Sequence, residues 1–259
     1  MISFGRETWR SRGLVDALVR RHVATRYRGS LFGFLWSFLN PLCLMAVYTL
    51  VFHYFMRFNG GEHYNLMVFA GLLPWIWTSS ALSEGTASLV GSGHLITKSM
   101  FPAHILPLVS ILSTMVHFVL ALPMLAVFMC IAGLSVPASW CFLPLLIVLH
   151  GFILNGIVLA LSALNVFYRD VQHLVANLLT FLFFLCPVVY PASAVPERFR
   201  FILDLNPFAV LTTCYQRVLV EGVLPTPQAV VFLSVTAIVS LITGVAVHDR
   251  FRERFAEAL

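Results

Sequence analysis

Six apolar runs, each long enough to cross a lipid bilayer as a helix, dominate the sequence. Crossing a hydrocarbon core of about 30 Å takes about 20 helical residues, because each residue adds about 1.5 Å along the axis. Charged residues make up only 10% of the chain, whereas soluble domains carry roughly 25%. We therefore predict an all-α membrane protein with six transmembrane helices, at 31–56, 66–91, 105–132, 141–167, 174–192 and 228–247.

Basic residues set the orientation of these spans. Six crossings place both termini on the same side of the membrane, and Lys and Arg accumulate in segments on the cytoplasmic side. With the termini inside, twelve of the sixteen Lys and Arg residues face the cytoplasm. The sequence therefore predicts a multi-pass protein with both termini cytoplasmic. The net charge of +5 fits anionic membrane lipids, and no nucleic-acid partner is expected.

The segment 8–28, ahead of the first apolar run, has the pattern of an amphipathic helix. Asp16 and Arg20 are four residues apart, a favourable spacing for an ion pair on one helix face. The segment is suited to lying in the membrane interface with its basic face outward, and an ordinary soluble helix is the alternative. The apolar side of the helical wheel consists of Leu14, Val15, Leu18, Val19 and Val23.

Between the last two apolar runs, residues 194–222 contain short helical signals and no further span. Asn206 can cap a helix start, and Pro207 suits the first helical position. This helix would end near Gly222, which makes it too short to cross the bilayer. We predict short re-entrant or interfacial helices on the outer side, with a plain interfacial loop as the alternative.

The sequence lacks the motifs of ATP hydrolysis, metal binding and nucleophilic catalysis. Lys98 is the single lysine and precedes a serine, but Thr97 and Ser92 occupy the glycine positions of a phosphate-binding loop. No HExxH, GxSxG or His/Cys cluster is present. We therefore expect no catalytic or metal site in this chain, and any ATP-driven work must come from a partner.

Polar groups inside apolar runs are functional candidates by default, and His117, His150 and Glu84 are the ones considered for such a role. His117 and His150 are expected to form hydrogen bonds with neighbouring helices. Glu84 lies near one end of the second run, and one acid in that place is weak support for a proton relay.

Aromatic residues are abundant, with 23 Phe, 5 Trp and 7 Tyr. Many of them fall inside the spans and not only at the two interfaces. Lipid packing and interface anchoring account for such residues. An aromatic-lined passage is the functional alternative, because aromatic faces can stack on sugar rings while tolerating small shifts in position.

Four segments of the sequence resemble ABC-2 type permeases that export bacterial surface polysaccharides, most closely the O-antigen (lipopolysaccharide) exporter branch. In the first segment, the arginine-rich entry, Gly33, Trp36 and Asn40-Pro41 match the first-span pattern of that family. This segment is the most specific of the four. The segments are RYRGSLFGFLWSFLNPLCLMAVYTLVF (26–52), GLLPWIWTSSAL (71–82), NVFYRDVQHLVANLLTFLFFLCPVVYP (165–191) and LNPFAVLTTCYQRVL (205–219).

The resemblance implies a single ABC-2 type transmembrane domain over 1–259, in a homodimer that binds two copies of a separate ATPase subunit. It implies a lipid-linked polysaccharide as the transported species and the bacterial inner (cytoplasmic) membrane as the location. ATP and Mg²⁺ would be bound by the ATPase subunit. This chain would hold no cofactor and would act as a transport channel subunit, not as an enzyme.

The resemblance also assigns roles to three segments. Residues 8–28 match the interface helix of the family, 91–103 its coupling helix, which docks on the ATPase, and 194–222 its outer gate helices. The side chains predicted for these roles are Arg20, Arg21, Arg26 and Arg28 on the interface helix, His94, Leu95, Ile96, Lys98 and Met100 at the ATPase, Asn206, Pro207, Tyr215 and Arg217 at the outer gate, and Phe32, Trp36, Tyr48, Phe181, Phe184 and Tyr190 in the channel wall.

Other functions remain open at this point. Capsule and teichoic acid exporters are close to the O-antigen branch, and a drug or small-lipid exporter could share the fold. A membrane enzyme of polysaccharide assembly would turn over its substrate without an ATPase partner, and the missing catalytic clusters count against it.

Overall fold

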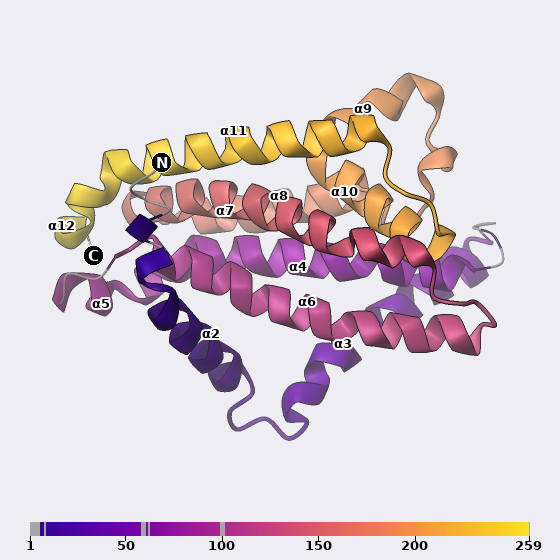
Figure 1. Cartoon of the computed structure of the whole chain (residues 1–259), viewed down its shortest axis with the longest axis horizontal. Coiled ribbons are helices and arrows are strands. Elements are labelled where there is room, and N and C mark those ends of the chain that lie inside the picture. Colours follow the sequence, from indigo (N-terminus) through magenta and orange to yellow (C-terminus); the bar gives the residue numbers. More distant parts are fainter. Residues whose placement is uncertain (1–5, 8, 58–60, 62, 99–101, 259) are drawn as a thin grey trace.

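A computed structural model describes residues 6–7, 9–57, 61, 63–98 and 102–258 as a bundle of long helices (Figure 1). The described residues form no strand. Both termini and the short helix α5 lie at one end of the bundle, called here the terminal end, and α9 lies at the opposite, distal end (Figure 1). The helices are α2 Arg12–Arg26, α3 Trp36–Tyr48, α4 Tyr64–Gly91, α5 Gly93–Lys98, α6 Ile105–Ile131, α7 Leu143–Phe167, α8 Val171–Leu185, α9 Arg200–Leu205, α10 Pro207–Gln216, α11 Pro227–Phe251 and α12 Phe255–Ala258.

Within the described part of the chain, five helical segments are long and apolar enough to cross a membrane, as the sequence predicts for five of its six runs. The first of them combines α3 with a short 3₁₀ turn before it and a π-helical segment, Thr49–Phe55, after it. The protein is therefore a multi-pass, all-helical membrane protein. The five segments are Gly33–Phe55, Tyr64–Gly91, Ile105–Ile131, Ala138–Phe167 and Pro227–Arg254.

The remaining apolar run, 174–192, contains α8 and a non-helical continuation. α8 has 15 residues and is about 22 Å long, short of a 30 Å hydrocarbon core. It ends at Leu185, and Cys186 is already extended. Pro187 follows directly and disfavours a helical conformation at the residue before it. Helix length alone therefore accounts for five crossings.

Helix α4 is the centre of the bundle. It contacts α3, α6, α7, α8 and α10, and 72% of its most apolar stretch is buried, against 6% for the first span. Gly71 permits one of these close contacts, because a Cβ atom there would lie 2.8 Å from Gln216 Nε2 and 3.3 Å from the Val188 Cα atom. The central helix thus packs on protein along most of its length.

Two glycines allow α7 and α11 to cross with their backbones in contact. A Cβ atom on Gly156 would lie 2.1 Å from the Ser240 carbonyl carbon, and one on Gly244 would lie 2.1 Å from the Gly156 carbonyl oxygen. Ser240 and Gly244 are four residues apart on α11, so they form the small-residue pattern typical of membrane helix contacts. Close backbone approach replaces the hydrophobic effect, which lipid tails do not provide.

The short helix α10 begins as the sequence predicts. The Asn206 side chain accepts a hydrogen bond from the Phe208 amide at 3.1 Å, and Pro207 occupies the first turn. A π-helical turn, Arg217–Glu221, continues the helix, and Gly222 then has a positive φ of 72° that ends it. α10 packs against α4, α7 and α11, so it lies inside the bundle and not on its surface.

We predict that Gly156→Ala destabilises the protein, whereas Gly151→Ala on the same helix does not. The added methyl group at position 156 would overlap the α11 backbone, at a cost of roughly 2 kcal/mol. At position 151 the nearest atom is a Trp77 carbon 3.9 Å away, so alanine only improves helix propensity. Thermal unfolding in detergent, followed by size-exclusion chromatography, measures both effects. Equal melting temperatures for the two variants would contradict the assigned backbone contact.

Candidate functional site

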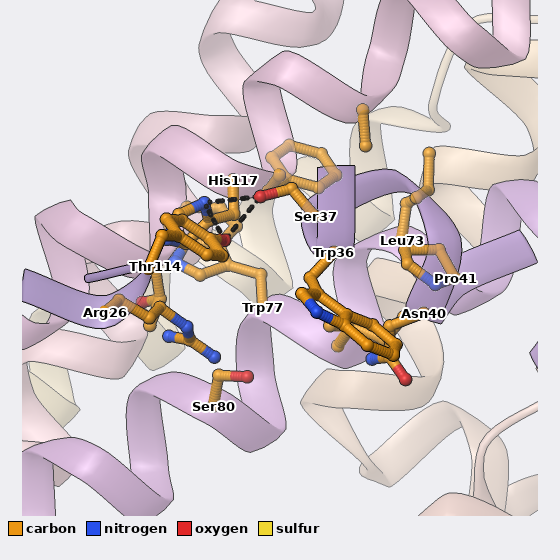
Figure 2. Close-up of a pocket in the computed structure, with 14 residues that line it drawn as sticks. Arg26, Trp36, Ser37, Asn40, Pro41, Leu73, Trp77, Ser80, Thr114 and His117 are labelled. Carbon is orange, nitrogen blue, oxygen red and sulfur yellow. Dashed lines mark hydrogen bonds between the residues drawn. The ribbon is translucent and has the colours of Figure 1, made fainter. Parts of the chain in front are cut away.

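A pocket opens where the elbow between α2 and α3 meets α4 and α6 (Figure 2). Gly29 and Gly33 bend the chain at this elbow, with φ values of +82° and +47° that favour glycine. The cavity has a volume of about 270 Å³. Its lining residues are Arg26, Tyr27, Trp36, Ser37, Asn40, Pro41, Leu73, Ile76, Trp77, Ser80, Thr114, His117, Phe118 and Ala121.

The pocket has a polar end and a more apolar end. Figure 2 shows Arg26, Ser80 and Thr114 at one end and Leu73 with Pro41 at the other. α4 runs toward the terminal end, and Ser80 lies about two turns beyond Leu73. The arginine therefore lies on the side of the terminal end, and the apolar residues lie deeper in the bundle.

An ion pair connects α2 to α4 beside this pocket. Arg26 Nη1 donates to Glu84 Oε1 at 2.7 Å, and His22 Nε2 lies 3.4 Å from Glu84 Oε2. Arg26 and Glu84 are far apart in the sequence, and this pair was not predicted. The available signal was the acid itself, because a carboxylate at membrane depth requires a cationic partner.

Glu84 also borders a second cavity, a groove of about 390 Å³ between α2, the end of α4, α5 and α6. Arg21, His22, His94 and Leu95 line this groove as well. Two residues predicted for the interface helix and the coupling helix, Arg21 and His94, thus share one groove at the terminal end.

Hydrogen bonds of two histidines hold helices together at mid-bundle, as the sequence predicts. His117 Nδ1 lies 3.2 Å from both the Tyr27 hydroxyl and the Ser37 hydroxyl, which also bond to each other. His150 Nε2 lies 2.9 Å from the Thr78 hydroxyl. The first group ties the elbow to α6, and the second ties α7 to α4.

The predicted channel aromatics lie mainly on α3 and α8, and many residues of both helices are exposed. Trp36 is 47% and Phe181 67% exposed. Tyr48 packs on Phe183, with ring centroids 5.3 Å apart, so the two helices meet over α4. Of the six predicted residues, Trp36 also lines the pocket. The other exposed members of the set are Phe32 and Phe184, whereas Tyr48 and Tyr190 are half-buried.

Four of the five predicted coupling residues belong to α5, which packs against the C-terminal helix α12. Leu95 contacts a small apolar cluster that includes Leu89 and Phe255, and Phe255 is 1% exposed. His94 is exposed, Ile96 and Lys98 lie on α5, and Met100 falls outside the described residues. The contact between the C-terminal segment and α5 was not predicted from the sequence.

The residues predicted at the outer gate lie at the N-cap of α10, on α10 or on its continuation. Tyr215 is fully buried and packs on Phe118 and His150. Arg217 begins the π-helical turn after α10. Gln216, which the sequence analysis did not single out, donates to the backbone carbonyls of Met67 at 3.2 Å and Pro187 at 2.9 Å. This amide fastens α10 to two other segments.

The remaining predicted arginines of the N-terminal segment lie at the surface. Arg20, Arg21 and Arg28 are exposed, and Arg20 Nε donates to Asp16 at 2.9 Å, the pair expected from the spacing. The apolar face of α2 packs on α6 through Val15, Ile105 and Val109. α2 therefore presents a basic face outward.

The arrangement defines a class: a multi-pass helical membrane protein with a polar pocket between an amphipathic N-terminal helix and the bundle. Residues 14–220 match the ABC-2 type transporter family, and the chain belongs to this family. The match covers most of the chain, including α10 and its continuation.

Similarity to individual proteins extends over the whole length. The chain is 37% identical to the O-antigen export system permease protein RfbA of Myxococcus xanthus, with all of both chains covered. It is 29% identical to an RfbA of Klebsiella pneumoniae over 95% of each chain. It is 24% identical to the polysialic acid transport protein KpsM of Escherichia coli, over 92% of this chain and 93% of that one.

We predict that Glu84→Gln loosens α2 from the bundle. The substitution removes the charge that pairs with Arg26, and the half-exposed pair should contribute about 1 kcal/mol. Hydrogen exchange in α2 should accelerate several-fold. The matched control is Asp16→Asn, which breaks the more exposed pair with Arg20 and should change exchange much less. Equal effects of the two substitutions would contradict a role for Glu84 in fixing α2.

Proposed function

We propose that this chain is the transmembrane subunit of an ATP-driven exporter that moves a lipid-linked polysaccharide of the O-antigen type out of the cytoplasm. The observation that carries the proposal is the full-length similarity to permeases of O-antigen export systems, at 37% identity in one case. The chain would lie in the bacterial inner membrane, with both termini in the cytoplasm. The chain supplies the conduit and performs no chemistry itself.

The exposed surface of the protomer supports a homodimer. α3 and α8 flank α4 and carry exposed aromatic side chains at Trp36, Phe181 and Phe184, and Phe32 is exposed just before α3. In a homodimer these surfaces would face a central passage, where aromatic faces can stack on successive sugar rings. The segment from α8 through Pro191 would complete a sixth crossing, because its non-helical part adds length beyond Leu185.

The terminal end of the bundle supports binding of two ATPase subunits. α2, α5 and the groove between them lie together there, and no phosphate-binding loop exists in the chain. ATP and Mg²⁺ would be bound by the partner, whose motion would reach the bundle through α5 and α2. α9 and α10 would form the outer gate at the distal end.

A capsule polysaccharide is the second candidate substrate. The similarity to KpsM favours it, although the identity is lower than to the O-antigen permeases. The two substrates share a lipid-anchored polysaccharide, so the same passage and the same ATPase contact would serve either.

We predict that deletion of the gene traps lipid-linked polysaccharide inside the cell. Without the conduit, polymer synthesis continues and its product stays at the cytoplasmic face. Surface extraction and electrophoresis of the polysaccharide, before and after cell lysis, measure its location, and a plasmid copy should restore export. An unchanged surface polysaccharide would point to a drug or small-lipid exporter instead.

We predict that the double substitution Ile96→Asp with Met100→Asp abolishes association with the ATPase. Two carboxylates in an apolar docking surface would have to be desolvated without partners, which costs several kcal/mol. Co-purification in detergent measures association. The matched control is Val223→Asp with Leu224→Asp, two exposed apolar residues after α10. Normal association of the first variant would refute the coupling role of 91–103.

A further inference from the structure

The elbow pocket contains more hydrogen-bond donors than its own contacts use. Arg26 donates to Glu84 through Nη1, and a guanidinium group has five N–H donors. Trp36 contributes an indole N–H, Asn40 an amide and Ser80 a hydroxyl group to the same lining. Figure 2 shows Arg26 and Ser80 facing the pocket from one end, with Trp36 and Asn40 across from them. Such a donor set suits a ligand rich in acceptor oxygens.

The charge of the pocket favours an anion. Among the described residues that line it, none is acidic, and Arg26 is the charged one. Glu84, the partner of Arg26, borders the neighbouring groove and not this pocket. The carboxylate therefore holds the arginine from behind, while the remaining donors of the guanidinium can meet a ligand. Arginine is well matched to phosphate because its planar fork can form two parallel hydrogen bonds.

The position of the pocket points to a lipid as the source of that anion. Arg26 ends α2, the amphipathic helix proposed to lie at headgroup level on the cytoplasmic side. From there the lining becomes apolar toward the bilayer interior, through Ile76, Leu73 and Ala121. A lipid in the cytoplasmic leaflet has the same polarity, with its phosphate at the interface and its chain directed inward.

We propose that the elbow pocket binds the phosphate of a membrane lipid, with Arg26 as its principal ligand and the adjoining apolar wall along the lipid chain. The choice of lipid rests on the proposed function. In an exporter of lipid-linked polysaccharide, the lipid is the polyprenyl phosphate-type carrier of the transported polysaccharide. A volume of about 270 Å³ is below the range of roughly 300–1,000 Å³ typical of drug-sized ligands. The pocket thus suits a headgroup and the first sugar, not a length of polymer.

Native mass spectrometry of the permease purified together with its ATPase tests this site. The probes are a long-chain polyprenyl phosphate, the corresponding polyprenol without phosphate, and phosphatidylglycerol. We expect polyprenyl phosphate to bind more tightly than polyprenol. Arg26→Gln should weaken its binding about tenfold, the value of one charge-assisted hydrogen bond. Arg250→Gln removes the same charge from an exposed position outside the pocket and should leave binding unchanged.

The variant Glu84→Gln distinguishes a direct role of Arg26 in binding the ligand from its role in holding α2 in place. This variant loses the ion pair but keeps the guanidinium group, so it should weaken phosphate binding clearly less than Arg26→Gln does. Equal weakening by both variants, or equal binding of polyprenol and polyprenyl phosphate, would overturn the site. Equal binding of phosphatidylglycerol and polyprenyl phosphate supports the phosphate site and assigns bulk lipid as its source. The binding measurement does not depend on transport. Loss of the proposed lipid site can therefore be distinguished from loss of the proposed export function, which the deletion strain tests.

Discussion

The apolar solvent around the spans determines how this protein is held together. Lipid tails solvate apolar side chains as well as a protein core does, so burial of apolar side chains does not drive helices together in the membrane. Contact must come from close packing and from hydrogen bonds between helices. The crossing of α7 and α11 at Gly156, Ser240 and Gly244 is the clearest case, since the two backbones touch there. The burial of α4 among five other helices extends the same principle through the centre of the bundle.

Polar groups inside the spans then mark the places where one helix is tied to another. His150 bonds to Thr78 between α7 and α4, and Gln216 donates to the backbone carbonyls of Met67 and Pro187. The pair of Arg26 and Glu84 ties the N-terminal helix to α4. Each of these groups would be costly in hydrocarbon without its partner. These paired polar groups therefore fix the relative positions of the helices more precisely than the packing of small residues would alone.

Local sequence patterns predicted much of the fold, but they could not predict contacts between residues far apart in the sequence. Residues that are close in the sequence determine the presence of five long apolar spans, the Asn206 cap of α10 and the Asp16–Arg20 pair. Arg26 and Glu84 lie 58 residues apart, and Gln216 and Met67 lie 149 apart, so composition and periodicity could not join them. The run at 174–192 was predicted by apolarity alone, which does not distinguish a helix from the non-helical segment after Leu185. The elbow pocket was missed for the same reason, because its lining comes from four separate segments.

The uneven burial of the spans links the fold to the proposed function. Almost none of the first span is buried in the protomer, whereas most of α4 is buried. α4 is therefore a fixed element, and α3 is free to contact lipid, substrate or a second copy of the chain. α2 is joined to α4 by Arg26 and Glu84, and it continues through the elbow into α3. A displacement of α2 by a partner at the terminal end would therefore strain that ion pair and move Trp36 relative to Ser80 across the pocket. In this way the residue proposed to hold the lipid phosphate would also lie on the path from the proposed ATPase subunit to the proposed conduit.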